Sequence, residues 1–441
     1  FEKYAKNNKI DNSIKLYIDG RGDIECNNNG YHSDFFMCLN SSLSLNNVLY
    51  KSHTKKEFKY LEKYGVKSVY ESGVFRWGYR RNYIKPKIHY SYKYKREYSL
   101  IKSLIDSYDL ERFNWSIFFK KNNVKIYTSW FKYSNKHMAI SDAIKDNGGV
   151  ATIWQMAFDG FQNFENTICT DIQYVFSKFD LTLNKILKNK TQIDYICGYP
   201  KAYAAKLVSN EAQEIRDYLR SNGAKKIIFC IDENSIDDSR WHTGHKLQQE
   251  NYSCILREVL KKPWLGVVFK PKNYLNLRKR LGDVNNLLMQ AESTGRCYVY
   301  KKSGRHTTSA PPILAGLSAD VCIHGHLNAG TAALECAIEG IPTLLVDREG
   351  APFSVFYKMG QDNIIFKNWD SALESAIKYF QHPDSVSKFG SWYKFTADIG
   401  LYNNFTHNIG DNLDEILGLY NKGHERDKIL KYLKNNREAG R

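Results

Sequence analysis

The 441-residue sequence lacks three features that would place a protein in a membrane or outside the cell. It contains no run of about 20 apolar residues, the length a helix needs to span a bilayer. Its first residues, FEKYAKNNKIDNS, are polar and have no apolar signal-peptide region. We therefore expect a cytoplasmic protein. The chain begins with Phe rather than Met, so whether it is a fragment stays open.

The sequence also lacks the cysteine spacings that are typical of zinc sites. The nine cysteines are odd in number, are scattered, and show no zinc-binding spacing. Cys197, Cys230 and Cys322 lie inside apolar segments, which favours reduced, buried thiols in a cytoplasmic protein. The pair His324 and His326 has no third ligand at a suitable spacing, so we expect no metal site.

Acidic residues are fewer than basic ones, and the formal net charge is +17. A basic surface attracts anions, which include nucleic acid, an anionic membrane leaflet, acidic sugars and nucleotides. Residues 79–98 combine seven Lys or Arg with six Tyr, a composition that suits nucleic acid or an anionic glycan. The same alternation describes an exposed strand with a solvated cationic face, which we favour. The abundant Lys, Asn, Tyr and Ile are also typical of an AT-rich genome.

From residue 124 onwards, short apolar segments alternate with amphipathic ones, which predicts α/β domains with doubly wound parallel sheets. The length favours two domains rather than one. We expect a first domain over 1–205, a second over 224–385 and C-terminal helices over 386–441. A linker with a polar helix is expected over 200–224. The predicted strands are 13–18, 124–128, 151–156, 171–176, 194–197, 225–231, 265–269, 297–300, 321–323 and 343–346, and the predicted helices include 55–64, 136–145, 179–187, 246–260, 275–291 and 332–339.

Polar side chains follow the predicted strands of the second domain. Because the carboxyl ends of parallel strands meet at one edge, these side chains should converge there. Cationic side chains at this edge would bind an anionic ligand such as a phosphate. A carboxylate would serve as general base or covalent nucleophile. The candidates are Asp232 and Glu233 for catalysis, Lys270, Lys272, Arg305, His306, His324 and His326 for binding, and Asp159 of the first domain for acceptor activation.

Each of these residues also has a structural interpretation. Asp232 would cap the turn that follows it, and Asp159 would be a turn residue beside Gly160. Each histidine would be a hydrogen-bonded loop residue. For Asp159 and the histidines we favour the structural interpretation, whereas the two interpretations of Asp232 are level.

Residues 321–347 form the most informative segment, which reads as strand, glycine-bearing loop, helix and strand. Gly340 occupies the position of a helix C-cap glycine, and Pro342 follows it. The loop would open at the carboxyl edge of the sheet, where a helix N-terminus offers backbone N–H groups to phosphate.

This segment resembles the donor-binding half of GT-B glycosyltransferases, which have two Rossmann-like domains facing a cleft. The shared pattern is G-T-x-x-x-E-x-x-x-x-G-x-P, here Gly330, Thr331, Glu335, Gly340 and Pro342. The resemblance implies that Gly330 and Thr331 lie against the nucleotide phosphates and that Glu335 binds a ribose hydroxyl. The pattern also occurs in sugar-nucleotide epimerases and polyol-phosphate polymerases of related fold.

Residues 269–272, FKPK, resemble the K-P-H turn of bacterial capsule and lipopolysaccharide transferases, with Lys272 in place of the histidine. The segment around Asp232 is weakly similar to transferases that use CMP-activated Kdo or related sugar acids. These resemblances imply a glycosyltransferase of surface-polysaccharide biosynthesis. Its donor would be a nucleotide sugar, with a CMP-linked sugar acid among the candidates, and its acceptor a glycan or lipid-linked glycan.

The same resemblances imply metal independence, because no D-x-D element follows a predicted strand. They imply peripheral contact with the inner membrane and no nucleic-acid partner. Two alternatives stay open. One is an epimerase or polymerase of similar fold, and the other is a noncatalytic protein that binds an anionic polymer through residues 79–98.

Overall fold

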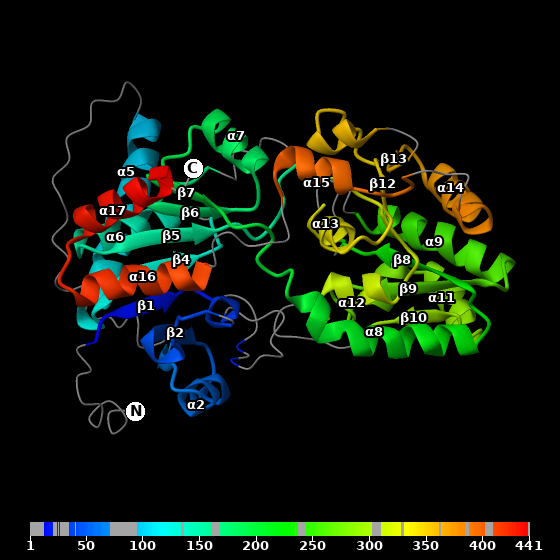
Figure 1. Cartoon of the computed structure of the whole chain (residues 1–441), viewed down its shortest axis with the longest axis horizontal. Helices are drawn as coiled ribbons and strands as arrows, with labels where there is room; N and C mark the ends of the chain where they lie inside the picture. The colour runs from blue at the N-terminus through cyan, green and yellow to red at the C-terminus, as the bar shows by residue number, and fades with distance from the viewer. Residues whose placement is uncertain are drawn as a thin grey trace.

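The computed structural model contains two parallel β-sheets, each covered by helices on both faces (Figure 1). It describes residues 13–20, 24, 26, 35–39, 41–70, 95–133, 136–160, 167–233, 235–236, 244–301, 310–327, 330–360, 363–383, 388–401 and 409–439. Strand pairing is parallel throughout both sheets, which confirms the predicted α/β class with two doubly wound domains.

The first sheet has seven strands in the order β3-β2-β1-β4-β5-β6-β7. Their bounds are β1 Lys15–Ile18, β2 Val48–Ser52, β3 Lys67–Tyr70, β4 Val124–Ser129, β5 Val150–Trp154, β6 Ile172–Val175 and β7 Ile193–Ile196. The second sheet has six strands in the order β10-β9-β8-β11-β12-β13. These are β8 Lys226–Ile231, β9 Leu265–Lys270, β10 Cys297–Val299, β11 Val321–His324, β12 Thr343–Val346 and β13 Ile365–Phe366.

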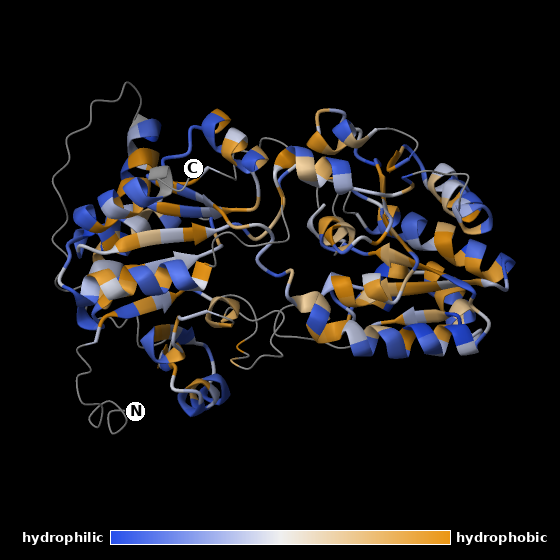
Figure 2. Ribbon diagram, viewed as in Figure 1, coloured by the Kyte–Doolittle hydropathy of each residue, from blue (hydrophilic) through white to orange (hydrophobic). Residues whose placement is uncertain are grey.

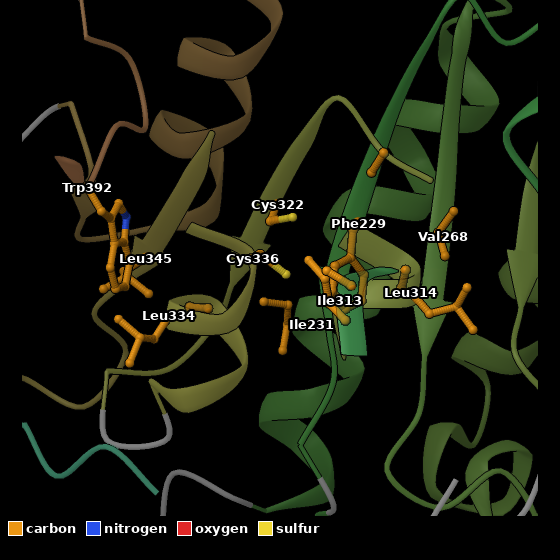
Figure 3. Close-up of a cluster of buried hydrophobic side chains, with 14 of the residues drawn as sticks. Phe229, Ile231, Val268, Ile313, Leu314, Cys322, Leu334, Cys336, Leu345 and Trp392 are labelled. Carbon is orange, nitrogen blue, oxygen red and sulfur yellow. The ribbon is translucent and has the colours of Figure 1, made fainter. Parts of the chain in front are cut away.

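The central strands are apolar because both faces of each sheet are covered. In β8, KIIFCI, the last five residues are buried. Their side chains alternate between two cores, one beneath α12 (Pro312–Leu317) and α13 (Thr331–Ile338) and the other beneath α9 (His245–Lys261) and α14 (Trp369–Gln381). Figure 3 shows the first of these cores, where Phe229 and Val268 of the sheet lie near Ile313 and Leu314, and Leu334 lies near Leu345. Colouring by hydropathy shows the same division, with apolar strands inside and polar helix faces outside (Figure 2).

The helices of the first domain are α2 Lys55–Lys63, α5 Lys95–Lys121, α6 Lys136–Asp146, α7 Lys178–Ile186, α16 Ile409–Asn421 and α17 Arg426–Ala439. Those of the second are α8 Ala204–Ser221, α9 His245–Lys261, α10 Leu277–Leu281, α11 Val284–Ser293, α12 Pro312–Leu317, α13 Thr331–Ile338, α14 Trp369–Gln381 and α15 Tyr393–Ile399. Short 3₁₀ helices lie at Phe36–Cys38, Leu45–Asn47 and Val355–Met359.

The C-terminal helices α16 and α17 return to the first domain and lie against its sheet (Figure 1). Tyr174 on β6 donates a hydrogen bond to Asn412 of α16, at 2.5 Å. Arg426 at the start of α17 contacts the buried carboxylate of Asp171, at 2.6 Å. Apolar residues of both helices join the core of the first sheet, so the end of the chain completes the first domain.

The segment predicted as a linker belongs to the second domain. It forms α8, whose buried residues Val208, Ala212, Ile215 and Leu219 share a core with α12 and the second sheet. The apolar stripe of α8 is narrow and its other faces are charged, and from this composition the sequence predicted a polar linker helix. The chain therefore crosses between the domains before α8, at residues 200–203.

A second correction concerns residues 275–291, which were predicted as one helix. They form α10 and α11, because Gly282 adopts a φ of 53° and ends α10. Most of residues 79–98 lie outside the described residues. Lys95 to Tyr98 form the beginning of the helix α5 rather than a strand.

Candidate functional site

The strand register brings the predicted residues of the second domain together. Ile231 of β8 pairs with Lys270 of β9 on one side and with His324 of β11 on the other. Asp232 and Glu233, which follow Ile231, therefore lie between Lys270 and His324 at the carboxyl edge of the sheet. As predicted, the ends of neighbouring strands collect charged side chains at one place.

Asp232 is held in a buried ion pair. One of its oxygens lies 3.1 Å from the Arg280 guanidinium and 3.3 Å from the backbone N–H of Lys272. Burial raises the pKa of Asp232 to about 6, although the charge of Arg280 opposes this. A carboxylate held in this way braces the turn, which favours the structural interpretation of Asp232.

Arg280 was not predicted from the sequence, yet it organises this turn. It is 3% exposed and also donates hydrogen bonds to the backbone carbonyl of Glu233 and to Ser235 Oγ, at 3.3 and 3.0 Å. The basic sequence of α10, LRKRL, indicates a solvated helix and gives no sign of this contact. Because the guanidinium binds three groups of one turn, it fixes the backbone from which the Glu233 side chain projects.

Glu233 has different partners from those of Asp232. Its carboxylate lies 3.6 Å from His324 Nε2 and 3.4 Å from Lys272 Nζ. Burial favours the neutral carboxyl, but the neighbouring imidazole and the Lys272 ammonium outweigh it and lower the pKa of Glu233 to about 2. Burial also lowers the pKa of His324, although Glu233 opposes this.

His326 has different partners, although its ring centroid lies 5.7 Å from that of His324. Its Nε2 lies 2.9 Å from the Gln248 amide, and its Nδ1 lies 3.3 Å from the Glu349 carboxylate. The other oxygen of Glu349 accepts a hydrogen bond from the backbone N–H of Leu327. These contacts brace the loop after β11, as the structural interpretation of a loop histidine predicts. A role for His326 in binding a ligand stays a prediction.

Lys270 ends β9, and no described residue carries a carboxylate within ion-pair distance of its ammonium group. Burial lowers the pKa of Lys270, although the carboxylates of Glu335, Glu233 and Asp232 oppose this. A partly buried cation without a paired anion is expensive for the protein alone. An anionic ligand at this position would provide the missing partner.

The residues of the G-T-x-x-x-E pattern contact protein groups. Gly330 leaves no room for a side chain, because an added Cβ would lie 2.4 Å from the Phe356 ring. Thr331 Oγ1 accepts a hydrogen bond from the backbone N–H of Phe158, at 2.8 Å. Glu335 accepts from Tyr199 Oη at 2.7 Å and from the Ile313 N–H at 3.1 Å.

Two of these contacts join the domains, since Phe158 follows β5 and Tyr199 follows β7 of the first domain. Burial raises the pKa of Glu335, although these hydrogen bonds and the nearby Lys270 and Lys201 oppose this. The predicted contacts of Gly330, Thr331 and Glu335 with a nucleotide stay predictions. What the structure shows is that this pattern also holds the two domains together.

Asp159 of the first domain lies beside this junction. Its neighbour Gly160 accepts a hydrogen bond from the Val355 N–H of the second domain, at 2.9 Å. The Asp159 carboxylate is partly exposed and lies 3.4 Å from Lys132 Nζ. Its role in acceptor activation stays a prediction. Arg305 and His306 lie outside the described residues.

No protein-family model matches this chain, and no curated protein matches it. Solved structures match it over almost the whole length. MnaA of S. aureus with UDP has a TM-score of 0.53 at 9% identity, covering 93% of this chain and 97% of that one. UDP-GlcNAc 2-epimerase from Neisseria meningitidis, bound to UDP-GlcNAc, has a TM-score of 0.51 at 9% identity, covering 92% of this chain and 99% of that one.

The chain has the GT-B fold. At 9% identity the similarity shows the arrangement of the two Rossmann-like domains and does not transfer an activity. Within the described part of this GT-B chain, no helix is both long enough and apolar enough to cross a membrane. The same residues include no group of three or more His, Cys, Asp or Glu arranged to hold a metal ion.

Proposed function

We propose that this chain is a glycosyltransferase that moves a sugar from a nucleotide-sugar donor to a glycan or lipid-linked glycan of a surface polysaccharide. The observation that supports it most strongly is Lys270 at the carboxyl edge of the second sheet, a partly buried cation that has no ion-pair partner among the described residues. In open α/β sheets, ligands bind outside this edge. A phosphate of the donor is the anion that Lys270 suits.

The surrounding residues divide into distinct tasks. Lys270, with Lys272 beside it, would stabilise the charge that grows on the leaving phosphate as the glycosidic bond breaks. Glu233, ionised and fixed by its turn, would act as base or nucleophile. Asp159 lies on the opposite domain, where it would accept the proton of the acceptor hydroxyl. Asp232 would support Glu233 through Arg280 and take no part in the chemistry.

The identity of the donor is part of the proposal. The two similar structures contain UDP and UDP-GlcNAc, and this favours a uridine nucleotide. The resemblance around Asp232 favours a CMP-linked sugar acid, which the basic composition would also suit. A panel of nucleotides decides between the two.

The first test is thermal stabilisation of the protein by CMP, UDP, GDP, ADP and dTDP. A ligand that binds only the folded protein stabilises it by about 2.7 kcal/mol at a hundredfold excess over its dissociation constant. We expect one nucleotide to raise the melting temperature and Lys270→Met to abolish most of this rise. Lys261→Met is the matched control, because Lys261 is exposed at the end of α9, at the opposite edge of the sheet. The absence of a shift with every nucleotide would refute the proposal.

A product assay then identifies the reaction. The donor that corresponds to the stabilising nucleotide is incubated with and without glycan or lipid-linked acceptors. Transfer requires the acceptor and releases the nucleotide. Conversion of the donor to an isomer without an acceptor would instead identify an epimerase, and dependence on a polyol-phosphate donor would identify a polymerase.

A further inference from the structure

A second group of polar side chains lies in the first domain, on and before α6. This helix follows the loop after β4 and begins at the carboxyl edge of the first sheet. His137, in its first turn, is 3% exposed, and Ser141, one turn later on the same face, is 1% exposed. Lys132 belongs to the loop between β4 and α6. We call these three residues the α6 cluster.

The buried groups of the α6 cluster have no partner within the described residues. Neither ring nitrogen of His137 forms a hydrogen bond there, and Ser141 Oγ forms none. Buried side-chain polar atoms in folded proteins normally have a partner, because leaving one without a hydrogen bond costs free energy. Three unsatisfied atoms on one face of a helix therefore indicate a place where a polar ligand binds.

The charges around His137 favour an anion as that ligand. Burial lowers the pKa of His137 to about 4, and the charges of Lys145 and Lys132 add to this while Asp142 opposes it. Among the described residues Lys132 is paired only with Asp159, at 3.4 Å, and Lys145 lies 3.6 and 4.0 Å from Asp142 and Asp171. The N-terminus of α6 contributes further positive potential. The two lysine charges thus disfavour protonation of His137, and Asp142 offsets part of their effect.

We propose that the α6 cluster binds an oxyanion of the acceptor, a phosphate or carboxylate group. The ring N–H of His137 and the hydroxyl of Ser141 are hydrogen-bond donors, and Lys132 supplies a charge. The inference rests on the proposed function, because the cluster lies on the same sheet edge as Asp159, where the acceptor would be activated. It assigns the acceptor to the class of acidic glycans or phosphate-linked glycolipids.

The protonation of His137 reports on binding directly. The full chain is labelled at histidine Cε1 and titrated by NMR in chloride, in acetate and in inorganic phosphate at matched ionic strength. His137→Gln assigns the resonance. We expect phosphate or acetate to raise the pKa of His137 by about one unit or more, which corresponds to roughly tenfold tighter binding of the anion to the protonated ring.

The two arms distinguish the source of the oxyanion, since phosphate represents a phosphate ester and acetate a carboxylate. An unchanged titration in both would overturn the inference and would assign His137 to a buried position satisfied by water. Chloride at the same ionic strength is the reference. If adding chloride to a low-salt buffer shifts the pKa of His137 as much as phosphate or acetate does, the shift reports ionic strength alone and the inference is overturned.

Variants separate this site from the donor site. Lys132→Gln keeps the core intact. It should raise the dissociation constant of inorganic phosphate or acetate, measured through thermal stabilisation, about tenfold, and His137→Leu should do the same if it folds. His424→Gln, at an exposed histidine between α16 and α17, is the matched control and should change nothing. Nucleotide stabilisation should persist in all three variants. If it persists and the oxyanion effect is unaffected by Lys132→Gln, the inference fails while the proposed function stands.

Discussion

At the residue scale, Asp232 and Glu233 show how neighbours in the sequence acquire different chemistry. Both follow β8, but Asp232 is bound to a buried guanidinium and Glu233 faces an imidazole and an ammonium. The pKa of Asp232 is raised by burial and that of Glu233 is lowered by its neighbours. The environment therefore favours a structural role for Asp232 and, under the proposed function, a chemical role for Glu233.

Two substitutions separate these roles. Asp232→Asn leaves Arg280 buried without its counter-charge, and removing one partner of a buried pair costs about 3–5 kcal/mol of unfolding free energy. Glu233→Gln should cost less stability, while removing the base or nucleophile should lower the transfer rate by about 10²–10⁴-fold. Denaturant unfolding and a transfer assay measure the two effects. If Asp232→Asn were stable but inactive, Asp232 would have the chemical role that is proposed for Glu233.

His137 predicts a pH dependence of stability. Its pKa is lowered from 6.5 to about 4, so the folded state resists a proton that the unfolded state accepts. The stability that depends on the neutral ring is complete above the unfolded pKa of 6.5 and is lost as the pH falls toward 4. The change is about 3 kcal/mol.

His137→Leu cannot be protonated and should remove this dependence. The free energy of unfolding of the variant minus that of the native protein should rise as the pH falls from 6.5 to about 4, because only the native protein loses stability over this range. The buffers contain no phosphate. Denaturant unfolding at several pH values measures it. A difference that is constant with pH would show that the native imidazole takes up protons as freely as in the unfolded chain.

At the scale of elements, the N-terminus of α13 depends on Gly330. A Cβ at this position would lie 2.4 Å from the ring of Phe356, which is completely buried. Gly330→Ala should therefore destabilise the protein by about 1–3 kcal/mol through overpacking. Adding Phe356→Leu should recover part of the loss contributed by Gly330→Ala, because the ring is then absent.

Gly418→Ala is the control for this substitution. Gly418 lies within α16, and an added Cβ there would meet no atom within 4 Å. Alanine should leave stability unchanged or raise it by about 0.5–1 kcal/mol. Thermal unfolding compares the variants. If Gly330→Ala were as harmless as Gly418→Ala, the close packing of α13 on Phe356 would not be required.

The elements also show which parts of the fold are predictable. Strands from β4 onwards are short apolar runs, and this is the pattern that burial on both faces produces. The strand β2, VLYKS, and the 27-residue α5 were not predicted, because they mix apolar and charged residues without a clear period. The break between α10 and α11 depends on one glycine with positive φ within an otherwise helical pattern.

The site was predictable where local rules apply. The convergence of Lys270, Glu233 and His324 follows from the parallel sheet alone. Arg280 and Tyr199 contact partners 48 and 136 positions away in the chain, Asp232 and Glu335 respectively. No local pattern indicates contacts at such separations, and only the packed structure reveals them.

At the scale of the whole molecule, the two domains meet around α13. In the part of the chain that the structure describes, three hydrogen bonds join them, from Phe158 N to Thr331, from Val355 N to Gly160, and from Tyr199 to Glu335. The Phe158 ring adds an aromatic contact with Phe356, at 5.4 Å between centroids. Two residues that the GT-B pattern assigns to the donor, Thr331 and Glu335, thus also take part in the contact between the domains.

This overlap predicts competition between domain contact and donor binding. If a ribose hydroxyl binds Glu335, it takes the place of the Tyr199 hydroxyl. Tyr199→Phe removes that hydroxyl alone and leaves the buried carboxylate with the Ile313 N–H. A hydrogen bond to a charged group contributes about 1.5–3 kcal/mol, so the variant should lose stability of that order.

The nucleotide no longer has to displace the tyrosine hydroxyl, so its binding should become about tenfold tighter or more. Calorimetric titration of the native protein, Tyr199→Phe and Glu335→Gln with the stabilising nucleotide measures this. Glu335→Gln should bind the nucleotide more weakly than the native protein and Tyr199→Phe do. Weaker binding in Tyr199→Phe would mean that the hydroxyl orients Glu335 for the ribose. Unchanged binding in both variants would place the ribose elsewhere and leave the pair as a purely structural link between the domains.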